Sequence, residues 1–244
     1  MPKDDRRDIV GLASSYEAGT VIAPHAHDAH QIAHAISGTM RVSVQNTQWF
    51  VPPGCALWIP ANATHAIECV GRVEMRTAYL SKAYPPVQAS AVVVSVSPLM
   101  REVLVRLSEV VDRKQNLLLA DVLLNEIKRG ELEPLSIPIP RDPRIAELAR
   151  LLLANPADQT TLAAWAKRLG FSERSLIRSI RAETGMTFRE LRRLTRIMVA
   201  LDGLSAGKFV TEIAFEVGFQ TPSAFIHAFR LLVGKTPRQF ISEG

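Results

Sequence analysis

The stretch FVTEIAFEVGFQTPSAFIHAFRLLVGKTPRQF, residues 209–240, decides how the C-terminal part of this 244-residue chain is interpreted. An earlier stretch, TLAAWAKRLGFSERSLIRSIRAETGMTFREL at 161–191, repeats its pattern of apolar residues and glycines. Each copy has an apolar stripe at helical spacing, then a glycine followed by phenylalanine, then a second amphipathic stretch. A diverged repeat of this kind is typical of one supersecondary unit used twice. We therefore predict two helix-turn-helix units.

The second helix of each copy has a polar outer face. These faces carry Arg174, Arg178 and Arg181 in the first copy and Ser223, His227 and Arg230 in the second. A single arginine stripe is usually a solvated surface. Two stripes in register, each on the second helix of a unit that docks in the major groove, instead favour DNA reading.

The distribution of charge agrees with a polyanionic partner for this region. The chain has 29 basic and 24 acidic residues, a net charge of +5. From Asp142 onward there are 15 basic and 10 acidic residues, and 14 of each precede it. All of the net positive charge therefore lies in the C-terminal part, as expected when one domain binds nucleic acid and the other does not.

Residues 142–242 resemble the DNA-binding domain of the AraC/XylS family of bacterial transcription regulators. The resemblance rests on Ala166-x4-Phe171-Ser172-x3-Leu176-x3-Ile180-x4-Gly185 and on Ile213-Ala214-x2-Val217-Gly218-Phe219-x5-Phe225-x3-Phe229-x4-Gly234-x-Thr236-Pro237. It implies that two recognition helices enter successive major grooves of double-stranded DNA. By position, the base-reading candidates are Arg174, Ile177 and Arg178 in the first helix and Ser223, Ala224, Ile226 and His227 in the second.

A connecting helix is predicted between the two units. Thr187 and Glu190 have the spacing of a capping box, and an apolar face follows them. The rest of the surface of this helix carries Arg189, Arg192, Arg193 and Arg196. We expect solvated charge here, with phosphate contact by one or two of the four as the alternative.

Residues 9–82 have the pattern of an antiparallel β-barrel or jelly roll, which makes the chain an α+β multidomain protein. Short apolar or alternating runs are separated by turn residues such as Gly38-Thr39 and Pro52-Pro53-Gly54. The runs are 21–23, 31–36, 40–44, 48–51, 56–59, 65–70 and 73–80.

This region also resembles the cupins. Gly19-x5-His25-x-His27-x3-Gln31-x6-Gly38 matches the first cupin motif, with Gln31 where metal-binding members usually have glutamate. Gly54-x5-Pro60-x-Asn62-x2-His65 matches the second, with Asn62 in place of the usual glycine. The resemblance implies that His25, His27, Gln31 and His65 face the inside of the barrel.

Three interpretations of this set stay open. Three imidazoles and an amide oxygen could hold one divalent transition metal ion, although glutamine is a weaker ligand than glutamate. The same residues, with Trp58 as part of the wall, could instead form a metal-free effector site. Finally, the histidines could simply make hydrogen bonds within the barrel. His30 and His34 fit no ligand position, and we expect local polar or surface roles for them.

The segment 83–130 contains two predicted helices, at 98–113 and 117–129. Leu117, Leu118, Ala120, Leu124 and Ile127 give the second an apolar stripe, interrupted by Asp121, that could pack on the barrel or pair two subunits. We favour a homodimer, with Leu124 in the interface. The segment 131–141, ELEPLSIPIPR, has three prolines and no periodicity, and is predicted to be a linker.

The whole pattern predicts a sequence-specific transcription regulator, not an enzyme, with no required cofactor. Its barrel would sense a small-molecule effector, and RNA polymerase would be a partner if it is an activator. The alternative is a metal-dependent cupin enzyme fused to a DNA-binding domain. The charged N-terminus and the lack of a long apolar run predict a cytoplasmic protein without membrane contact.

Overall fold

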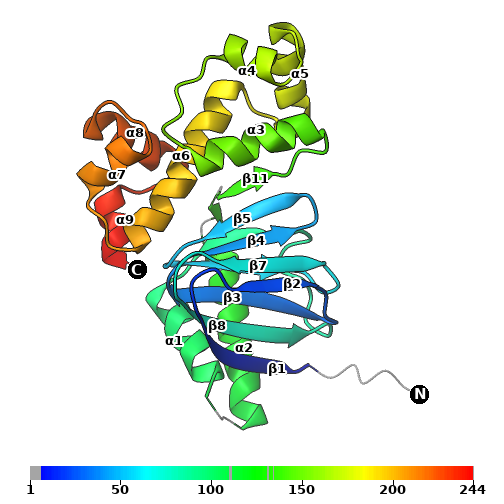
Figure 1. Ribbon diagram of the computed structural model, residues 1–244. Helices are drawn as coiled ribbons and strands as arrows, with labels where there is room; N and C mark the ends of the chain where they lie inside the picture. Colours follow the sequence, from blue (N-terminus) through cyan, green and yellow to red (C-terminus); the bar gives the residue numbers. More distant parts are fainter. Residues whose placement is uncertain (1–6, 110–111, 131, 134, 244) are drawn as a thin grey trace. The chain divides into compact units, whose positions relative to one another are not determined.

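The computed structural model describes residues 7–109, 112–130, 132–133 and 135–243 (Figure 1). The chain divides into two compact units. The first consists mainly of residues up to Leu135 and the second mainly of residues from Ser136 onward.

The strands form two sheets, as expected for a jelly roll. One has the order β1-β8-β3-β6-β9-β10 and the other the order β11-β5-β4-β7-β2. The first contains β1 (Ile9–Tyr16), β8 (Val73–Ser81), β3 (Ala29–Ser37), β6 (Cys55–Ile59), β9 (Val92–Ser95) and β10 (Leu132–Glu133). The second contains β11 (Ser136–Pro138), β5 (Thr47–Val51), β4 (Met40–Val44), β7 (His65–Cys69) and β2 (Val21–His25). The predicted α+β class is confirmed.

The sheets extend beyond the segment predicted to be β. Strand β9 lies inside the segment 83–130, which was predicted to be helical, and pairs with β6 from Cys55 opposite Ser95 to Trp58 opposite Val92. Strands β10 and β11 lie inside the predicted linker. Strands of two and three residues are too short to show an alternating pattern, and a partner strand far away in sequence determines them.

Two helices cover the outer face of the six-stranded sheet. They are α1 (Pro98–Leu107) and α2 (Arg113–Arg129), somewhat shifted from their predicted ends because Asp112 caps α2 and accepts hydrogen bonds from the backbone of Lys114 and Gln115. Gly11 of β1 permits close contact, since a Cβ at this residue would lie 2.0 Å from the carbonyl oxygen of Leu107.

The apolar stripe of α2 packs on its own barrel. Ala120, Leu123, Leu124 and Ile127 are buried in one cluster with residues of the sheet such as Leu80. The prediction that Leu124 lies in a dimer interface is therefore wrong. An amphipathic pattern shows which face is covered without showing by what.

The second unit is helical (Figure 1). Its helices are α3 (Pro143–Ala154), α4 (Leu162–Arg168), α5 (Glu173–Thr184), α6 (Phe188–Ser205), α7 (Val210–Glu216), α8 (Pro222–Val233) and α9 (Pro237–Glu243). Helices α4 and α5 form the first predicted helix-turn-helix unit, and α7 and α8 form the second. Helix α6 joins them, and its predicted capping box between Thr187 and Glu190 is present.

Aromatic residues hold the second helix-turn-helix unit together. The rings of Phe219, Phe225, Phe229 and Phe240 make a continuous chain of edge contacts, with centroids 5.5 to 5.7 Å apart. Such contacts add to the stabilisation gained by burying the rings. This core leaves the outer face of α8 free of any packing role.

Among the residues that the structure describes, no helix combines the length and apolar character needed to cross a membrane.

Candidate functional site

The two predicted recognition helices present their outer faces to solvent. All nine DNA-contact candidates are exposed, including the apolar Ile177 and Ile226, which are 48% and 37% exposed. The others are Arg174, Arg178 and Arg181 on α5 and Ser223, Ala224, His227 and Arg230 on α8. The opposite faces are buried, with Leu176 and Ile180 on α5 and Phe225 and Phe229 on α8.

Local sequence signals fix both ends of these helices. The hydroxyl of Ser172 accepts a hydrogen bond from the backbone of Ser175 at the start of α5. Thr221 does the same for Ala224 at the start of α8, where Pro222 occupies the first turn. Each helix ends at a glycine with positive φ, Gly185 at 72° and Gly234 at 80°. The helices are therefore well-defined surfaces for a groove.

The two surfaces differ chemically. Helix α5 exposes three guanidinium groups, which can form paired hydrogen bonds with guanine in the major groove. Helix α8 exposes one hydroxyl, one imidazole and one guanidinium beside the apolar Ile226. Helix α5 therefore offers long donors to a groove, whereas α8 offers mainly short polar and apolar groups.

The arginines of α6 are not equivalent. Arg189 is exposed, whereas Arg192 and Arg196 are half-buried and donate hydrogen bonds to backbone oxygens of Thr160 and Pro156. The prediction of solvated charge is therefore wrong for these two. Their guanidinium groups donate to backbone oxygens inside the protein.

In the first unit, the histidines of the two cupin motifs come together. His25 ends β2, His65 begins β7, and these two residues are paired directly across the strands. His27 lies in the connection between β2 and β3. One nitrogen from each of the three rings lies within 4.8 Å of the other two, and the ring centroids of His25 and His65 are 4.3 Å apart.

Backbone carbonyls set the orientation of all three rings. The Nδ1 atoms of His25, His27 and His65 lie 2.9, 2.8 and 2.9 Å from the carbonyl oxygens of Ala23, Ala29 and Ala63. A carbonyl oxygen can only accept, so each Nδ1 carries the hydrogen. In a neutral His25 or His65 ring the lone pair is then on Nε2, whereas Nε2 of His27 is already engaged by the carboxamide of Gln31. An imidazole whose Nδ1–H is held by a backbone carbonyl can use its other nitrogen to bind a metal ion or to accept a hydrogen bond.

Gln31 and Tyr79 join the cluster from the other sheet, where they are paired across β3 and β8. The carboxamide oxygen of Gln31 lies 3.0 Å from Nε2 of His27, and its nitrogen lies 3.4 Å from the hydroxyl oxygen of Tyr79. The Tyr79 ring meets that of His27 edge-on at 5.0 Å. Tyr79 was not among the predicted residues, because only the strand register shows that it faces Gln31.

Burial keeps part of the cluster neutral. Desolvation lowers the pKa of His65, the neighbouring His25 and His27 lower it further, and the hydrogen bond with Ala63 opposes the shift. Its Nε2 atom is buried and has no hydrogen-bond partner within the described part of the chain. A buried lone pair without a partner is costly, so the cluster is suited to receive a cation or a donor.

Trp58 does not belong to this cluster. It pairs with Ile32, one residue beyond the Gln31–Ile59 pair, and therefore points to the opposite face of its sheet. There it is fully buried among α1 and α2, stacks on His30 and donates a hydrogen bond to the carbonyl of Gln88. The prediction that Trp58 lines the effector site is therefore wrong.

His30 and His34 lie on the same outer face of β3 and are both buried, which excludes the surface alternative. Each makes a hydrogen bond to the backbone of another part of the barrel. Nδ1 of His30 accepts a hydrogen bond from the backbone of Ala61, and Nδ1 of His34 donates one to the carbonyl of Cys55.

Asn62 shows why the second cupin motif can lack its usual glycine. Its φ is 63°, a left-handed conformation that asparagine tolerates better than most residues. Its backbone N–H donates to the carbonyl of His27 at 2.9 Å and so fixes the loop that carries this histidine. The substitution therefore preserves the geometry of the site, and it is no argument against metal binding.

Comparison with known families assigns both units. A profile of the cupin domain matches residues 14–80, and a profile of the helix-turn-helix domain matches residues 165–243. The first match includes the histidine cluster, and the second includes both recognition helices.

The curated relatives are regulators. The HTH-type transcriptional regulator NimR of Escherichia coli K12 is 29% identical over 98% of this chain and 90% of its own length. RipA of Corynebacterium glutamicum, also an HTH-type transcriptional regulator, is 37% identical over 42% of this chain and 31% of its own length. Among solved structures, ToxT of Vibrio cholerae aligns over 97% of this chain and 98% of its own, at 13% identity and a TM-score of 0.43.

Proposed function

The chain belongs to the AraC family of DNA-binding transcription regulators with a cupin-type ligand-binding domain, and on that premise we propose that its histidine cluster is the effector site. His25, His27, Gln31 and His65, with the added Tyr79, would hold a small-molecule effector. Binding there would shift the population of regulator states and so change DNA binding. The chain would act as a regulator and not as an enzyme.

One observation carries this proposal: one nitrogen from each of three histidine rings lies within 4.8 Å of the other two, while all three Nδ1 atoms are engaged by backbone carbonyls. Histidines that served only the fold would have no need to bring three rings so close together. Gln31 and the Tyr79 hydroxyl supply donors and acceptors at the edge of the same place.

The cluster also fits a divalent transition metal ion as a resident group. Three neutral imidazoles are a common donor set for such ions, and Gln31 could add its amide oxygen. A bound ion would supply a Lewis acid to which an oxygen or nitrogen of the effector could attach. Its ligands would be His25, His27 and His65. We treat the ion as an optional part of the effector site and not as a required cofactor.

The test uses the full-length chain. If an ion occupies the site, elemental analysis after purification and calorimetric titration with zinc and manganese salts should show one ion per chain, lost in the double variant His27→Ala/His65→Ala. His30→Asn is the matched control, because His30 lies on the opposite face of β3. If the double variant binds metal as tightly as the wild-type chain, the ligand assignment is wrong.

The alternative function, a metal-dependent cupin enzyme with a DNA-binding tail, is favoured by the same three-histidine cluster. The regulator and the enzyme interpretations differ in whether metal binding is coupled to specific DNA binding. Specific binding to DNA selected from a random library, and a change in that binding on adding or removing the ion, support the regulator. A stoichiometric ion without any specific DNA binding supports the enzyme.

A homodimer remains part of the proposal, with a revised contact. Leu118 and Val122 lie one turn apart on the outward face of α2 and are 63% and 36% exposed. We place the subunit contact there. Leu118→Glu should yield monomers in sedimentation at micromolar concentration with the fold retained, whereas Leu124→Glu should destabilise the barrel. A monomeric wild-type chain would overturn this contact.

We place the protein in the cytoplasm, where its DNA partner lies. RNA polymerase would be a further partner if the protein activates transcription. Reporter transcription from a promoter that carries the selected DNA site, with and without the regulator, distinguishes activation from repression.

A further inference from the structure

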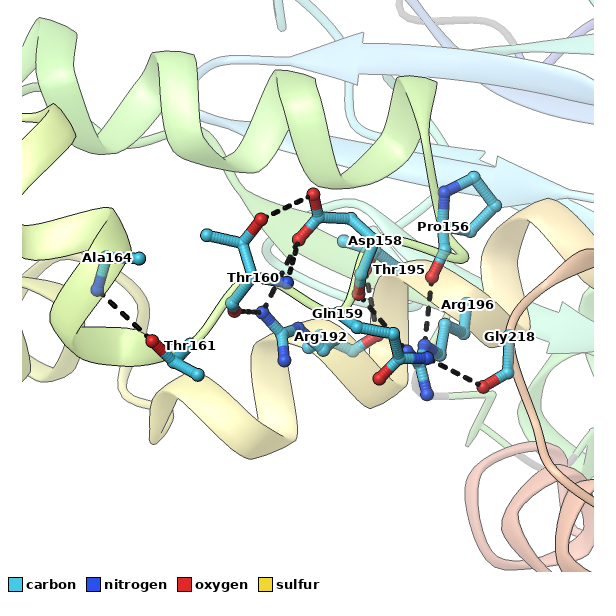
Figure 2. A network of polar contacts seen from close by, with 10 residues as sticks. All are labelled: Pro156, Asp158, Gln159, Thr160, Thr161, Ala164, Arg192, Thr195, Arg196 and Gly218. Carbon is cyan, nitrogen blue, oxygen red and sulfur yellow. Dashed lines mark hydrogen bonds and ion pairs between the residues drawn. The ribbon is translucent and has the colours of Figure 1, made fainter.

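We propose that a brace, formed by the loop at 155–161 together with Arg192 and Arg196 of α6, sets the distance between the two DNA-reading helices and so determines which operator spacing the protein accepts. This inference rests on the DNA-reading role of α5 and α8. It assigns a positioning role to the network of polar contacts that joins the loop to α6 (Figure 2).

Arg192 joins α6 to the start of the first helix-turn-helix unit. Its Nη2 donates a hydrogen bond to the carbonyl of Thr160 and lies 3.7 Å from a carboxylate oxygen of Asp158. The side chains of both partners of this ion pair are only 18% exposed. Thr161, the next residue, caps α4 by accepting from the backbone of Ala164. The arginine thus holds the point from which α4 begins.

Asp158 makes the loop itself rigid. One carboxylate oxygen accepts from the backbone N–H of Thr160 at 2.8 Å, and the other accepts from the Thr160 hydroxyl at 2.9 Å. Such a local arrangement fixes the backbone as a turn. The loop therefore keeps its own conformation, and elements attached to it are held at a fixed distance from one another.

Arg196, one helical turn further along α6, joins the same loop to the second unit. Its Nε donates to the carbonyl of Pro156 at 2.9 Å, and its Nη2 lies 3.4 Å from the carbonyl oxygen of Asp158. The same guanidinium lies over the ring of Phe219, 5.7 Å from its centre. Phe219 belongs to the turn between α7 and α8.

The loop and that turn also touch directly. The side-chain nitrogen of Gln159 donates to the carbonyl of Gly218 at 3.4 Å. Gly218 has a φ of 85°, and a Cβ at this residue would lie 2.7 Å from the Cα of Ala157 and 3.1 Å from Nη2 of Arg196. Only glycine permits this approach without displacement. The turn of the second unit therefore rests against the loop that starts the first.

A rigid α6 would not by itself fix the spacing of α5 and α8. Helix α5 is joined to α6 by one turn, and α8 is joined to it through α7 and a second turn, so both connections could pivot. The brace adds a second point of attachment shared by both units, and two arginines that are half-buried and partnered have little freedom to release it. Burial lowers the pKa of both guanidinium groups, and the charge of Asp158 opposes this shift.

The consequence is sensitivity to operator spacing. One inserted base pair moves a half-site by about 3.4 Å along the duplex and rotates it by about 35°. A braced pair of readers cannot follow this change without strain, so one helix loses its contacts. A loosened pair can follow it and should accept several spacings.

The experiment uses the full-length chain and DNA selected by it from a random library, remade with one or two base pairs inserted or deleted between the two contacted grooves. Wild-type affinity should fall on the order of 30-fold for a one-base-pair change, comparable to losing a good base contact. In Arg196→Gln and Gly218→Ala, affinity should fall only a few-fold between the best spacing and the altered one. This holds even if the variant binds the best spacing more weakly than the wild-type chain does. Arg196→Lys should behave like Arg196→Gln, because an ammonium group cannot reach both carbonyls and the ring together.

Arg189→Gln is the matched control, since it removes the same charge from an exposed position of the same helix. It should leave the spacing profile unchanged. If Arg196→Gln or Gly218→Ala fails to fold by circular dichroism, Gln159→Ala decides, because this exposed side chain can be removed without harm to the core. Folded brace variants with the wild-type profile, or a wild-type chain indifferent to spacing, would overturn the proposal. A wild-type chain that selects no DNA would overturn the reading role instead.

Discussion

Acidification should destabilise the barrel through His34, a histidine that lies outside the proposed effector site. Burial, together with the nearby Arg101 and Arg76, lowers its pKa from 6.5 to about 4, against the opposing effect of its hydrogen bond to the Cys55 carbonyl. Its Nε2 is buried and has no hydrogen-bond partner among the described residues. The folded protein therefore resists protonation of a ring that the unfolded chain protonates readily.

The size of the effect follows from the two pKa values. Above pH 6.5 both states are neutral at this ring, and stability is unaffected. As the pH falls toward 4, only the unfolded state gains the proton, so stability is lost progressively. Between pH 7 and pH 5 the loss should be about 2 kcal/mol for a pKa that falls from 6.5 to about 4.

Urea denaturation at pH 7 and pH 5 measures this loss. The chain has three tryptophans, and Trp165 lies in the DNA-binding unit, so a Trp165→Phe background leaves fluorescence from Trp49 and Trp58 to report on the barrel. His34→Asn in that background should lose about 2 kcal/mol less than its parent on acidification. Other histidines contribute equally to both proteins and cancel. An identical pH dependence in the two proteins would refute the reasoning.

Three further predictions concern DNA reading, packing and capping. Arg178→Ala should cost specific binding about 1–3 kcal/mol and relax preference at one base position, as a DNA selection with the variant would show. Gly11→Ala should lower the thermal midpoint, because its Cβ would lie 2.0 Å from the Leu107 carbonyl oxygen and force α1 away from β1. Thr187→Ala should destabilise the DNA-binding unit by about 1 kcal/mol in urea denaturation, through loss of the capping box.

Local signals allowed much of the fold to be predicted. Capping residues, Pro222 and glycines with positive φ act within a few residues, so the ends of α5 and α8 followed from the sequence. The cupin motifs also identified His25, His27 and His65, because motif spacing encodes which strand ends meet. Tyr79 escaped notice, since its place beside Gln31 depends on pairing between strands that are far apart in sequence.

Strand β6 shows why the face of Trp58 could not be predicted. All five of its residues are buried, because one face lies inside the barrel and helices α1 and α2 cover the other. A strand covered on both faces has no alternation of polar and apolar residues. Without alternation, only the register with β3 shows that Trp58 lies opposite Ile32 and away from Gln31.

The arginines of the DNA-binding unit make the same point for charge. Arg178 on α5 and Arg196 on α6 both belong to basic stripes of amphipathic helices, and nothing in their own helices separates them. The difference lies in a loop that precedes Arg196 by about forty residues and presents the carbonyl of Pro156 to it, 2.9 Å from its Nε. A guanidinium that finds backbone acceptors and an aromatic ring is held in place, whereas one that finds only solvent is free to meet a base. The role of an arginine on such a helix is therefore decided by its acceptors, which only the tertiary structure brings into reach.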